Sequence, residues 1–481
     1  MISGADGISG AAEANTGAVA CLRAPTADSS DESARPGPGR AKFEVTTRML
    51  IVGGLLAVAA LVWHVYALPI GNPYYGLFHN GLDLEVYRAG GEVIRERSGL
   101  YDGPVVFGME FTYTPFAALA FAPLTVISLA KAKMVWFAAT MLALVALTGR
   151  CLLVLKYRNT MRTWVFAALL AVLCTVLEPV RTTLWLGQIN VFLVLMVVWD
   201  LTRPPTARLR GVGVGIAAGM KLTPALFLIY LACTRQWRSL GIASGTFAAT
   251  IAVGFLLRPH DAYTYWRGQV AAAGRVGAVD SPGNQSVNGL VAQLLRFFDV
   301  QRFTSNVFGG TVFQPPTWLW LLAVVPVIGL GLAAATVAHR AGRELLAVTV
   351  VGMTSACASP FSWGHHWVWF VPLVILAWQY ARTATTGWAW LAPAAIVAVG
   401  FCWWWTFADR LPFEDSPHPI GIGLFMLPRA DNSVWFAYFT VPTYAGCYVL
   451  VQLVTSAVVL RRYIDPVRIP PRKAHHHVDC R

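Results

Sequence analysis

Residues 49–68 read MLIVGGLLAVAALVWHVYAL, twenty positions without a Lys, Arg, Asp or Glu. An α-helix needs about 20 apolar residues to cross the hydrocarbon core of a bilayer, so this stretch predicts a transmembrane helix. Similar apolar runs follow at 131–153, 163–180, 188–202, 238–257, 317–339, 344–358, 366–381, 387–406 and 434–460. The pattern predicts an all-α polytopic membrane protein with about ten transmembrane helices.

Two further apolar segments are interrupted. Residues 113–128 contain Pro115 and Pro123, and residues 211–234 are broken by the sequence GMKLTP at 219–224. Both predict broken or re-entrant helices, because loose backbone inside a membrane is tolerated only where protein or a watery cavity covers it. If both segments complete a crossing, the predicted count rises to about twelve.

The composition also favours a membrane protein. Of 481 residues, 56% are hydrophobic and 13% are charged, and the mean hydropathy is +0.55. A soluble domain carries about a quarter charged residues. The net charge of +13 would suggest nucleic acid on a soluble protein. Here the basic residues fall in short gaps between apolar runs, so they indicate membrane orientation, and no nucleic-acid partner is expected. The eight cysteines show no CxxC spacing, which indicates neither a disulfide framework nor a zinc site.

The basic gaps divide the chain between the two sides of the membrane. Placing them in the cytoplasm puts both ends of the chain there, with a disordered tail at 1–46, a transmembrane domain at 47–460 and a second tail at 461–481. The opposite side then receives the loops at 69–112, 258–316 and 407–432 and the short turns at 178–188 and 359–366. Most of the unusual polar motifs fall on this outer side.

The first outer loop contains the sequence DLEVYR at 83–88, where an amphipathic helix is predicted to start at Asp83. Asp83 can be the N-cap of that helix. It can also be a carboxylate at the membrane surface that takes a proton from an attacking hydroxyl. Glu85 is offset by two positions, which puts it on another helix face.

Charged residues near helix ends form a second group of candidates. Glu178 and Arg181 stand in a short outer turn that continues to Gln188, and Lys221 interrupts an apolar segment. Such groups are costly in lipid unless they are paired. Glu178 and Arg181 can pair with each other, while Lys221 can snorkel or approach a buried anion.

Two outer turns carry clustered hydrogen-bonding side chains. The first reads GNQSVNG at 283–289, which suits sugar hydroxyls and suits a plain turn equally well. The second reads SWGHHW at 362–367. Its adjacent histidines point in different directions and are poor joint metal ligands. One imidazole can donate to a phosphate with Trp363 stacked on a sugar, or the cluster can anchor the chain at the interface.

Taken in order, six motifs resemble a known family. They are DLEVY at 83–87, FTYTPF at 111–116, LGQIN at 186–190, MKLTP at 220–224, NQS at 284–286 and SWGHH at 362–366. The set resembles the actinobacterial polyprenyl-phosphate-mannose-dependent α-1,2-mannosyltransferases, which are multispanning GT-C enzymes of glycosyltransferase family 87. The family usually has two prolines after the tyrosine, and Thr114 replaces the first of them here.

The resemblance implies a lipid-linked mannosyl phosphate donor, a mannosylated glycolipid acceptor and catalysis on the outer face of the cytoplasmic membrane. It implies that Asp83 is the catalytic base. By the same resemblance, the donor phosphate or sugar would meet a set of polar side chains comprising Arg181, Gln188, Lys221, Trp363, His365 and His366. The acceptor would meet a second set comprising Tyr87, Asn284, Gln285, Ser286 and Asn288. No cofactor is expected, and no carboxylate cluster with metal geometry appears, so the reaction is predicted to be metal-independent.

Other functions fit parts of the same pattern. An arabinofuranosyltransferase of the same family would use decaprenyl-phosphate arabinose. A lipid or sugar transporter also needs broken helices and a polar cavity. A structural membrane subunit would leave the one-sided polar motifs unexplained.

Overall fold

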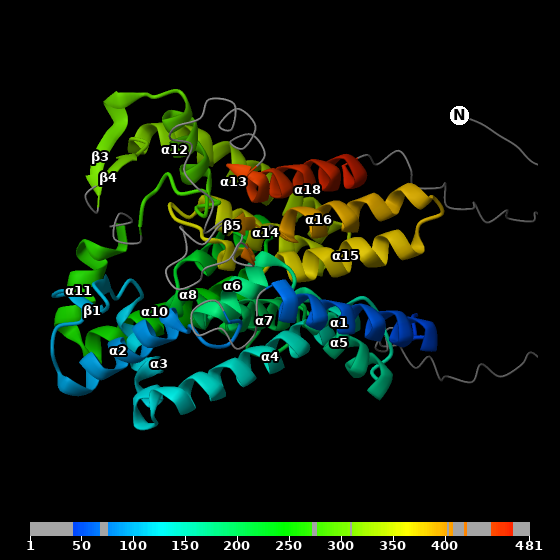
Figure 1. Cartoon of the computed structure of the whole chain (residues 1–481), viewed down its shortest axis with the longest axis horizontal. Helices are drawn as coiled ribbons and strands as arrows, with labels where there is room; N and C mark the ends of the chain where they lie inside the picture. Colours follow the sequence, from blue (N-terminus) through cyan, green and yellow to red (C-terminus); the bar gives the residue numbers. More distant parts are fainter. Residues whose placement is uncertain are drawn as a thin grey trace, which may run out of the picture. The chain divides into compact units, whose positions relative to one another are not determined.

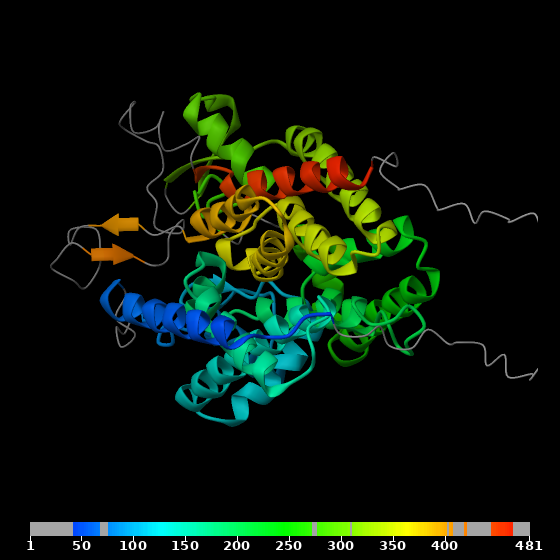
Figure 2. The same ribbon diagram turned by 90° about the vertical axis from the view of Figure 1, so that its right-hand side faces the viewer.

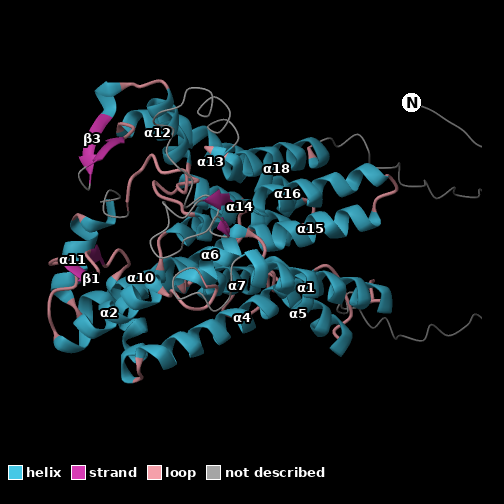
Figure 3. Cartoon of the chain, in the orientation of Figure 1, coloured by secondary structure: helices cyan, strands magenta, loops and turns pink. Residues whose placement is uncertain are grey.

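The computed structural model describes residues 42–67, 76–271, 277–307, 310–401, 404–406, 418–420 and 444–464. The predicted tails at 1–46 and 461–481 lie almost entirely outside these residues, as does most of the predicted loop at 407–432. The described part is mainly helical, and its few strands form three small antiparallel hairpins (Figures 1 and 3).

The α-helices of the described residues are α1 (Thr47–Ala67), α2 (Leu82–Glu96), α3 (Pro115–Phe121), α4 (Leu129–Val154), α5 (Met161–Cys174), α6 (Glu178–Leu186), α7 (Asn190–Leu201), α8 (Val212–Met220), α9 (Leu226–Cys233), α10 (Trp237–Leu257), α11 (Pro259–Arg267), α12 (Val287–Phe297), α13 (Thr317–Arg340), α14 (Glu344–Ala358), α15 (Phe370–Thr383), α16 (Leu391–Phe401) and α18 (Cys447–Tyr463). Short 3-10 helices are η1 (Ala122–Val126), η2 (Thr223–Ala225), η3 (Gln269–Ala271), η5 (Gln301–Phe303), η6 (Gly364–Trp367) and η7 (Gly387–Trp390). The hairpins pair β1 (Pro104–Val106) with β2 (Met109–Glu110), β3 (Thr304–Val307) with β4 (Gly310–Phe313), and β5 (Trp404–Thr406) with β6 (His418–Ile420).

Several helices have the length and composition of transmembrane segments. Within the described residues, α1, α4, α10 and α13 are each long and apolar enough to cross a membrane. The bent pair of α5 and α6 brings the number to five if it counts as one span. The all-α polytopic class is therefore confirmed, and the chain is a multi-pass membrane protein. The count of ten to twelve crossings stays a prediction, because α7, α14 and other apolar helices are shorter than about 20 residues.

Both predicted interruptions are present. The segment with two prolines forms α3 and η1, and the segment around Lys221 divides into α8, η2 and α9. One hydroxyl joins the two segments: Thr114 Oγ1 caps α3 by accepting from Ala117 N at 3.2 Å, and it donates to Gly219 O at 2.5 Å. The residue that departs from the family pattern therefore connects the start of α3 to the end of α8.

The predicted straight run at 163–180 is wrong at its end. Helix α5 stops at Cys174, and α6 starts at Glu178 with its axis bent by 85° from that of α5. Pro179 explains the break, because a proline has no N–H to donate and is tolerated in the first turn of a helix but not in its interior. The short outer turn expected at 178–188 is consequently a buried helix.

The long helices pack closely through small residues. Helices α13, α14 and α18 contact one another, and Figure 2 shows α18 in red running beside them. A Cβ added at Gly331 of α13 would lie 2.1 Å from Thr354 Oγ1, and Gln452 Nε2 of α18 donates to the same oxygen at 3.0 Å. Glycine contacts and hydrogen bonds between helices are typical of membrane bundles, where the hydrophobic effect does not drive helix association.

Several of the basic segments that are predicted to be cytoplasmic lie close to one another in space. Arg210, between α7 and α8, donates to Ser239 Oγ of α10 at 3.0 Å and lies 3.3 Å from Glu344 Oε1 at the start of α14. In Figure 1 the start of α1 lies at one end of the helices, while α2, α11, β1, β3 and β4 lie at the other. The side of the membrane that each end faces stays a prediction.

Candidate active site

The first turn of α2 presents Asp83. Gly81 precedes the helix in the left-handed region at φ 64°, and Asn80 Oδ1 accepts a hydrogen bond from Leu82 N at 2.9 Å. Asp83 is therefore not the N-cap, which removes the structural alternative considered from the sequence. The residue is half-buried, and its carboxylate instead accepts from Gln188 Nε2, at 2.5 Å from Oδ2.

Two tyrosines orient the Gln188 amide. Tyr87 lies one helical turn after Asp83, and its hydroxyl donates to Gln188 Oε1 at 2.9 Å. The Tyr113 hydroxyl lies 3.3 Å from the same oxygen and 2.9 Å from the Tyr87 hydroxyl. With the amide oxygen held by both phenols, the amide nitrogen faces Asp83. One carboxylate oxygen is then fixed, and the other stays available to a substrate.

The other side of the network contains a cation. Asn190, at the start of α7, donates to Gln188 Oε1 at 3.3 Å and to His365 O at 2.9 Å. Its Oδ1 accepts from Lys221 Nζ at 3.2 Å, and that nitrogen lies 2.8 Å from His366 Nε2. A chain of contacts thus runs from Asp83 to His366 and joins four segments that are distant in sequence.

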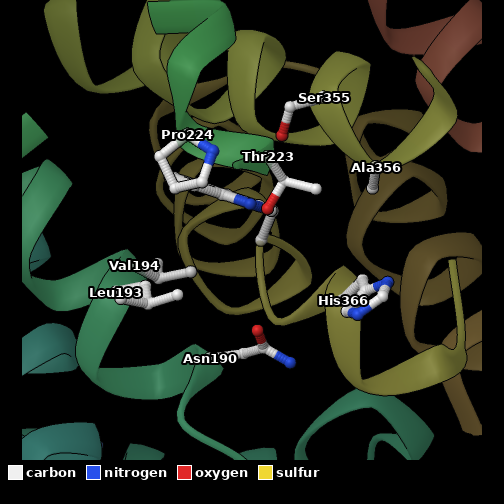
Figure 4. Close-up of a pocket in the computed structure, with 9 residues that line it drawn as sticks. Asn190, Leu193, Val194, Thr223, Pro224, Ser355, Ala356 and His366 are labelled. Carbon is white, nitrogen blue, oxygen red and sulfur yellow. The ribbon is translucent and has the colours of Figure 1, made fainter. Parts of the chain in front are cut away.

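A small cavity borders this cation. Its polar lining comes from Asn190, Thr223, Ser355 and His366, and the rest is apolar: Leu193, Val194, Pro224, Ala356 and Trp369. In Figure 4 the Asn190 amide, the Thr223 and Ser355 hydroxyls and the His366 ring are arranged around one space. Lys221 lies two residues before η2, whose Thr223 and Pro224 form one wall of the cavity. The cavity therefore combines hydrogen-bonding groups and a nearby ammonium with an apolar wall.

The two adjacent histidines have different surroundings. His366 is partly exposed and lines the cavity, while His365 is buried and offers its backbone carbonyl to Asn190. The ring planes are nearly perpendicular, with centroids 4.8 Å apart. His366 is consequently the member of the pair that faces the cavity.

Comparison with known proteins shows the family to which the chain belongs. The family model for glycosyltransferase family 87 matches residues 111–360. A Mycobacterium tuberculosis protein named polyprenol-phosphate-mannose-dependent alpha-(1-2)-phosphatidylinositol pentamannoside mannosyltransferase is 32% identical over 379 residues, which cover 76% of this chain and 80% of the relative. The chain belongs to glycosyltransferase family 87. It is therefore a glycosyltransferase.

Another relative matches over a longer stretch. A Mycolicibacterium smegmatis protein named polyprenol-phosphate-mannose-dependent alpha-(1-2)-phosphatidylinositol mannoside mannosyltransferase is 29% identical over 426 residues, which cover 84% of this chain and 89% of the relative. A Mycobacterium tuberculosis protein of the same name is 30% identical over 375 residues, covering 73% and 83% of the two chains. No solved structure matches this chain.

Of the residues expected around a family 87 donor, Gln188, Lys221 and His366 join the network. Arg181 is fully buried in α6, where it donates to Val176 O at 3.2 Å. Trp363 packs against Phe361 with ring centroids 4.9 Å apart. Neither belongs to the lining of the cavity described above, so their donor contacts stay predictions.

The predicted acceptor residues Asn284 and Gln285 are fully buried. Asn284 Oδ1 accepts from Ser362 N at 2.9 Å, and its Nδ2 donates to Val279 O at 2.9 Å. Gln285 Oε1 accepts from Tyr448 N at 3.2 Å. The Asn284 side chain therefore holds the turn that precedes η6, while the Gln285 side chain holds the start of α18.

Ser286 and Asn288 have similar partners. Ser286 Oγ caps α12 by accepting from Gly289 N at 2.9 Å, as the plain-turn interpretation expects. Ser286 Oγ and Asn288 Nδ2 both reach Pro360 O, at 3.3 and 3.2 Å. Direct contact of the 284–288 group with an acceptor stays a prediction, and the observed contacts join these side chains to backbone groups.

Two residues of the network were quoted in the family motifs but were absent from the predicted site. Asn190 connects Gln188 to Lys221, and the Tyr113 ring centroid lies 5.3 Å from Lys221 Nζ. The sequence offered one sign of their role: Asn190 lies in the same motif as Gln188, and Tyr113 lies in the motif that contains Pro115. Within the described residues, no group of three or more His, Cys, Asp and Glu side chains can hold a metal ion.

Gln188 is expected to position Asp83, and its removal should change the pH dependence of transfer. In Gln188→Ala the carboxylate loses a hydrogen bond that lowers its pKa, so the acid limb of the rate profile should move to higher pH. The rate should fall about ten- to a hundredfold, because misplacement by about 1 Å has that cost. An unchanged acid limb in a folded variant contradicts this role.

Gly364 is expected to tolerate no side chain. An added Cβ would lie 2.0 Å from Glu178 Oε1, whose carboxyl group is buried and also accepts from the Tyr448 hydroxyl at 2.7 Å. Gly364→Ala should therefore destabilise the protein by about 1–3 kcal/mol, measured by thermal unfolding in detergent. Gly245→Ala in α10 is the control, because its added Cβ meets nothing within 4 Å. Equal melting temperatures for the two variants would count against this packing argument.

Proposed function

We propose that this chain transfers mannose from polyprenyl-phosphate mannose to a mannosyl residue of a cell-envelope glycolipid and forms an α-1,2 linkage. One observation carries the proposal: the carboxylate of the half-buried Asp83 is connected by hydrogen bonds through Gln188 and Asn190 to the Lys221–His366 pair. A base therefore lies at one end of the network, and groups able to bind a phosphate lie at the other. The names of the family 87 relatives supply the sugar and the lipid carrier.

The chemistry follows as a direct displacement. Asp83 Oδ1 accepts the proton of an acceptor hydroxyl while its other oxygen is held by Gln188. The hydroxyl oxygen forms a bond to the anomeric carbon of a β-linked mannosyl phosphate. The bond from that carbon to the phosphate oxygen breaks, and the electron pair leaves with the polyprenyl phosphate. Attack from the opposite face inverts the linkage to α.

Lys221 and His366 suit the leaving group. Negative charge develops on the departing phosphate oxygen, and an ammonium held in place beside it stabilises such charge. The His366 Nε2 atom accepts from the ammonium at 2.8 Å, which holds the cation in place. Since phosphate is already a good leaving group, these groups suffice without a general acid.

The proposal places the reaction on the outer face of the cytoplasmic membrane, with both termini in the cytoplasm. The clustering of Arg210 with the starts of α10 and α14 supports this orientation under the positive-inside rule.

The proposed base predicts the pH dependence. Burial of the Asp83 side chain raises its pKa from 3.8 to about 6, opposed by the Gln188 hydrogen bond and the Lys221 charge. A base acts only when ionised, so kcat/KM should rise through about pH 6 and level off above it. Below that pH it should fall about tenfold per unit. A rate that stays constant from about pH 7 to about pH 5 contradicts Asp83 as the base.

The proposed function is tested with purified protein in lipid nanodiscs. Radiolabelled polyprenyl-phosphate mannose and decaprenyl-phosphate arabinose are supplied separately with phosphatidylinositol mannoside acceptors, and linkage analysis follows. The expected product is an α-1,2-mannoside formed from the mannose donor alone. Transfer of arabinose alone favours the rival transferase, and lipid movement across vesicles without a new glycosidic bond favours a transporter.

A further inference from the structure

A second, larger groove lies beside α2, outside the network described above. It is formed by the residues just before α2 and by the first three turns of α4: Phe78, His79, Ala130, Lys133, Met134, Phe137, Ala138 and Met141. The groove is open, and most of its lining is apolar. The lining residues Phe78 and Phe137 pack edge to face, with ring centroids 5.7 Å apart.

The groove lies on the outer surface of α4. This helix is long and apolar enough to cross a membrane, and the lining residue Met134 is 67% exposed, so in a bilayer the groove is expected to face lipid. From Ala130 to Met141 the helix rises about 16 Å. That length is close to the thickness of one leaflet of hydrocarbon, about 15 Å. The groove therefore suits an acyl chain from a single leaflet.

The head of the groove is continuous with the turn that presents Asp83. Lys133 Nζ donates to Asn80 O at 2.7 Å, and Asn80 stands three residues before Asp83. Lys133 Nζ also pairs with Glu85 Oε1 at 2.7 Å. Because this cation already has a carboxylate partner, the head of the groove is poorly suited to the donor phosphate, which Lys221 suits better. The headgroup of a lipid bound in this groove would lie near Asp83.

We propose that this groove seats an acyl chain of the acceptor glycolipid and so directs the acceptor hydroxyl to Asp83. The proposal rests on the proposed function for the identity of the acceptor. An acyl chain gains little free energy on leaving bilayer hydrocarbon for an apolar groove. The benefit is orientation of the headgroup, which acts on the rate of transfer to a membrane-anchored acceptor.

Filling the groove tests the proposal. Ala138 is exposed and lines it, so Ala138→Trp occupies the space without entering the core. Leu142→Trp is the matched control, because Leu142 is equally lipid-facing on α4 but does not line the groove. Each variant is assayed with a diacylated phosphatidylinositol mannoside and with its deacylated, water-soluble counterpart at a fixed donor concentration.

We expect Ala138→Trp to lower kcat/KM about tenfold for the diacylated acceptor and to leave the deacylated acceptor unaffected. Leu142→Trp should change neither rate. An equal loss with both acceptors, no loss with either, or a loss that varies with the prenyl length of the donor overturns the proposal. The last result would assign the groove to the donor chain.

A binding measurement separates failure of this proposal from failure of the proposed function. A photoreactive residue at position 134 should crosslink to an acceptor labelled in its acyl chain, and the same residue at position 142 should not. This readout requires no transfer, so it tests the groove even if no mannoside forms. Equal crosslinking at both positions overturns the groove assignment.

Discussion

The Asp83→Asn variant should lose about a thousandfold or more of the transfer rate while inserting and folding normally. Asparagine keeps the size of the side chain but cannot accept a proton, and general base catalysis accounts for about 100- to 10,000-fold. Gln188 cannot replace the missing base, because the atom that it presents to position 83 is the amide nitrogen Nε2, which donates a hydrogen bond and does not accept a proton. The rate is measured as radiolabelled mannose moved into glycolipid by purified protein.

The control for this variant lies on the same helix. Glu92 forms a partly exposed i,i+4 pair with Arg88, with side chains 40% and 22% exposed, and surface pairs contribute about 0–1 kcal/mol, so Glu92→Gln should retain the wild-type rate. Full activity in Asp83→Asn would remove Asp83 from the mechanism. An equal loss in Glu92→Gln would show that the rate reports the integrity of α2 rather than the base.

Lys221→Met is expected to have the second-largest effect, about 100- to 1,000-fold on kcat. Methionine preserves the apolar stem but removes the ammonium that faces His366 and Asn190, and loss of one charge-stabilising group at a reaction centre has that cost. The loss should appear mainly in kcat rather than in the KM of the donor, because charge on the phosphate oxygen increases in the transition state. Initial rates over a range of donor concentrations separate the two parameters.

Lys131→Met is the matched lysine substitution, because Lys131 is exposed at the start of α4. It should behave as wild type. If Lys221→Met raises only the KM of the donor, Lys221 binds the phosphate without stabilising its departure. If the variant is as active as Lys131→Met, Lys221 does not face the leaving group.

The sequence predicted the long helices well because their signal is local. Helices α1, α4, α10 and α13 coincide within a few residues with uninterrupted apolar runs. The bend between α5 and α6 was missed because Pro179 follows an apolar run that is long enough to be read as one helix. Hydropathy alone does not distinguish a proline in the first turn of a new helix from a proline that interrupts a continuous one.

The site was predicted residue by residue, but its connections were not. Asp83 and Gln188 are 105 positions apart, and Lys221 and His366 are 145 apart, so no local pattern indicates that they touch. The polar turn at 284–288 shows the opposite difficulty. A buried amide that supports a backbone turn has the same sequence signature as an exposed amide that binds a sugar.

Thr114 has a consequence for the spacing of the two reacting partners. Its neighbour Tyr113 belongs to the half of the site around the base, and Gly219, whose carbonyl it binds, stands two residues before Lys221. In the proposed reaction, this hydrogen bond helps to set the distance between the base and the leaving group, which an inverting displacement spans with one sugar ring. A family member with proline at this position has no side-chain donor there, so it must fix the same gap by another contact.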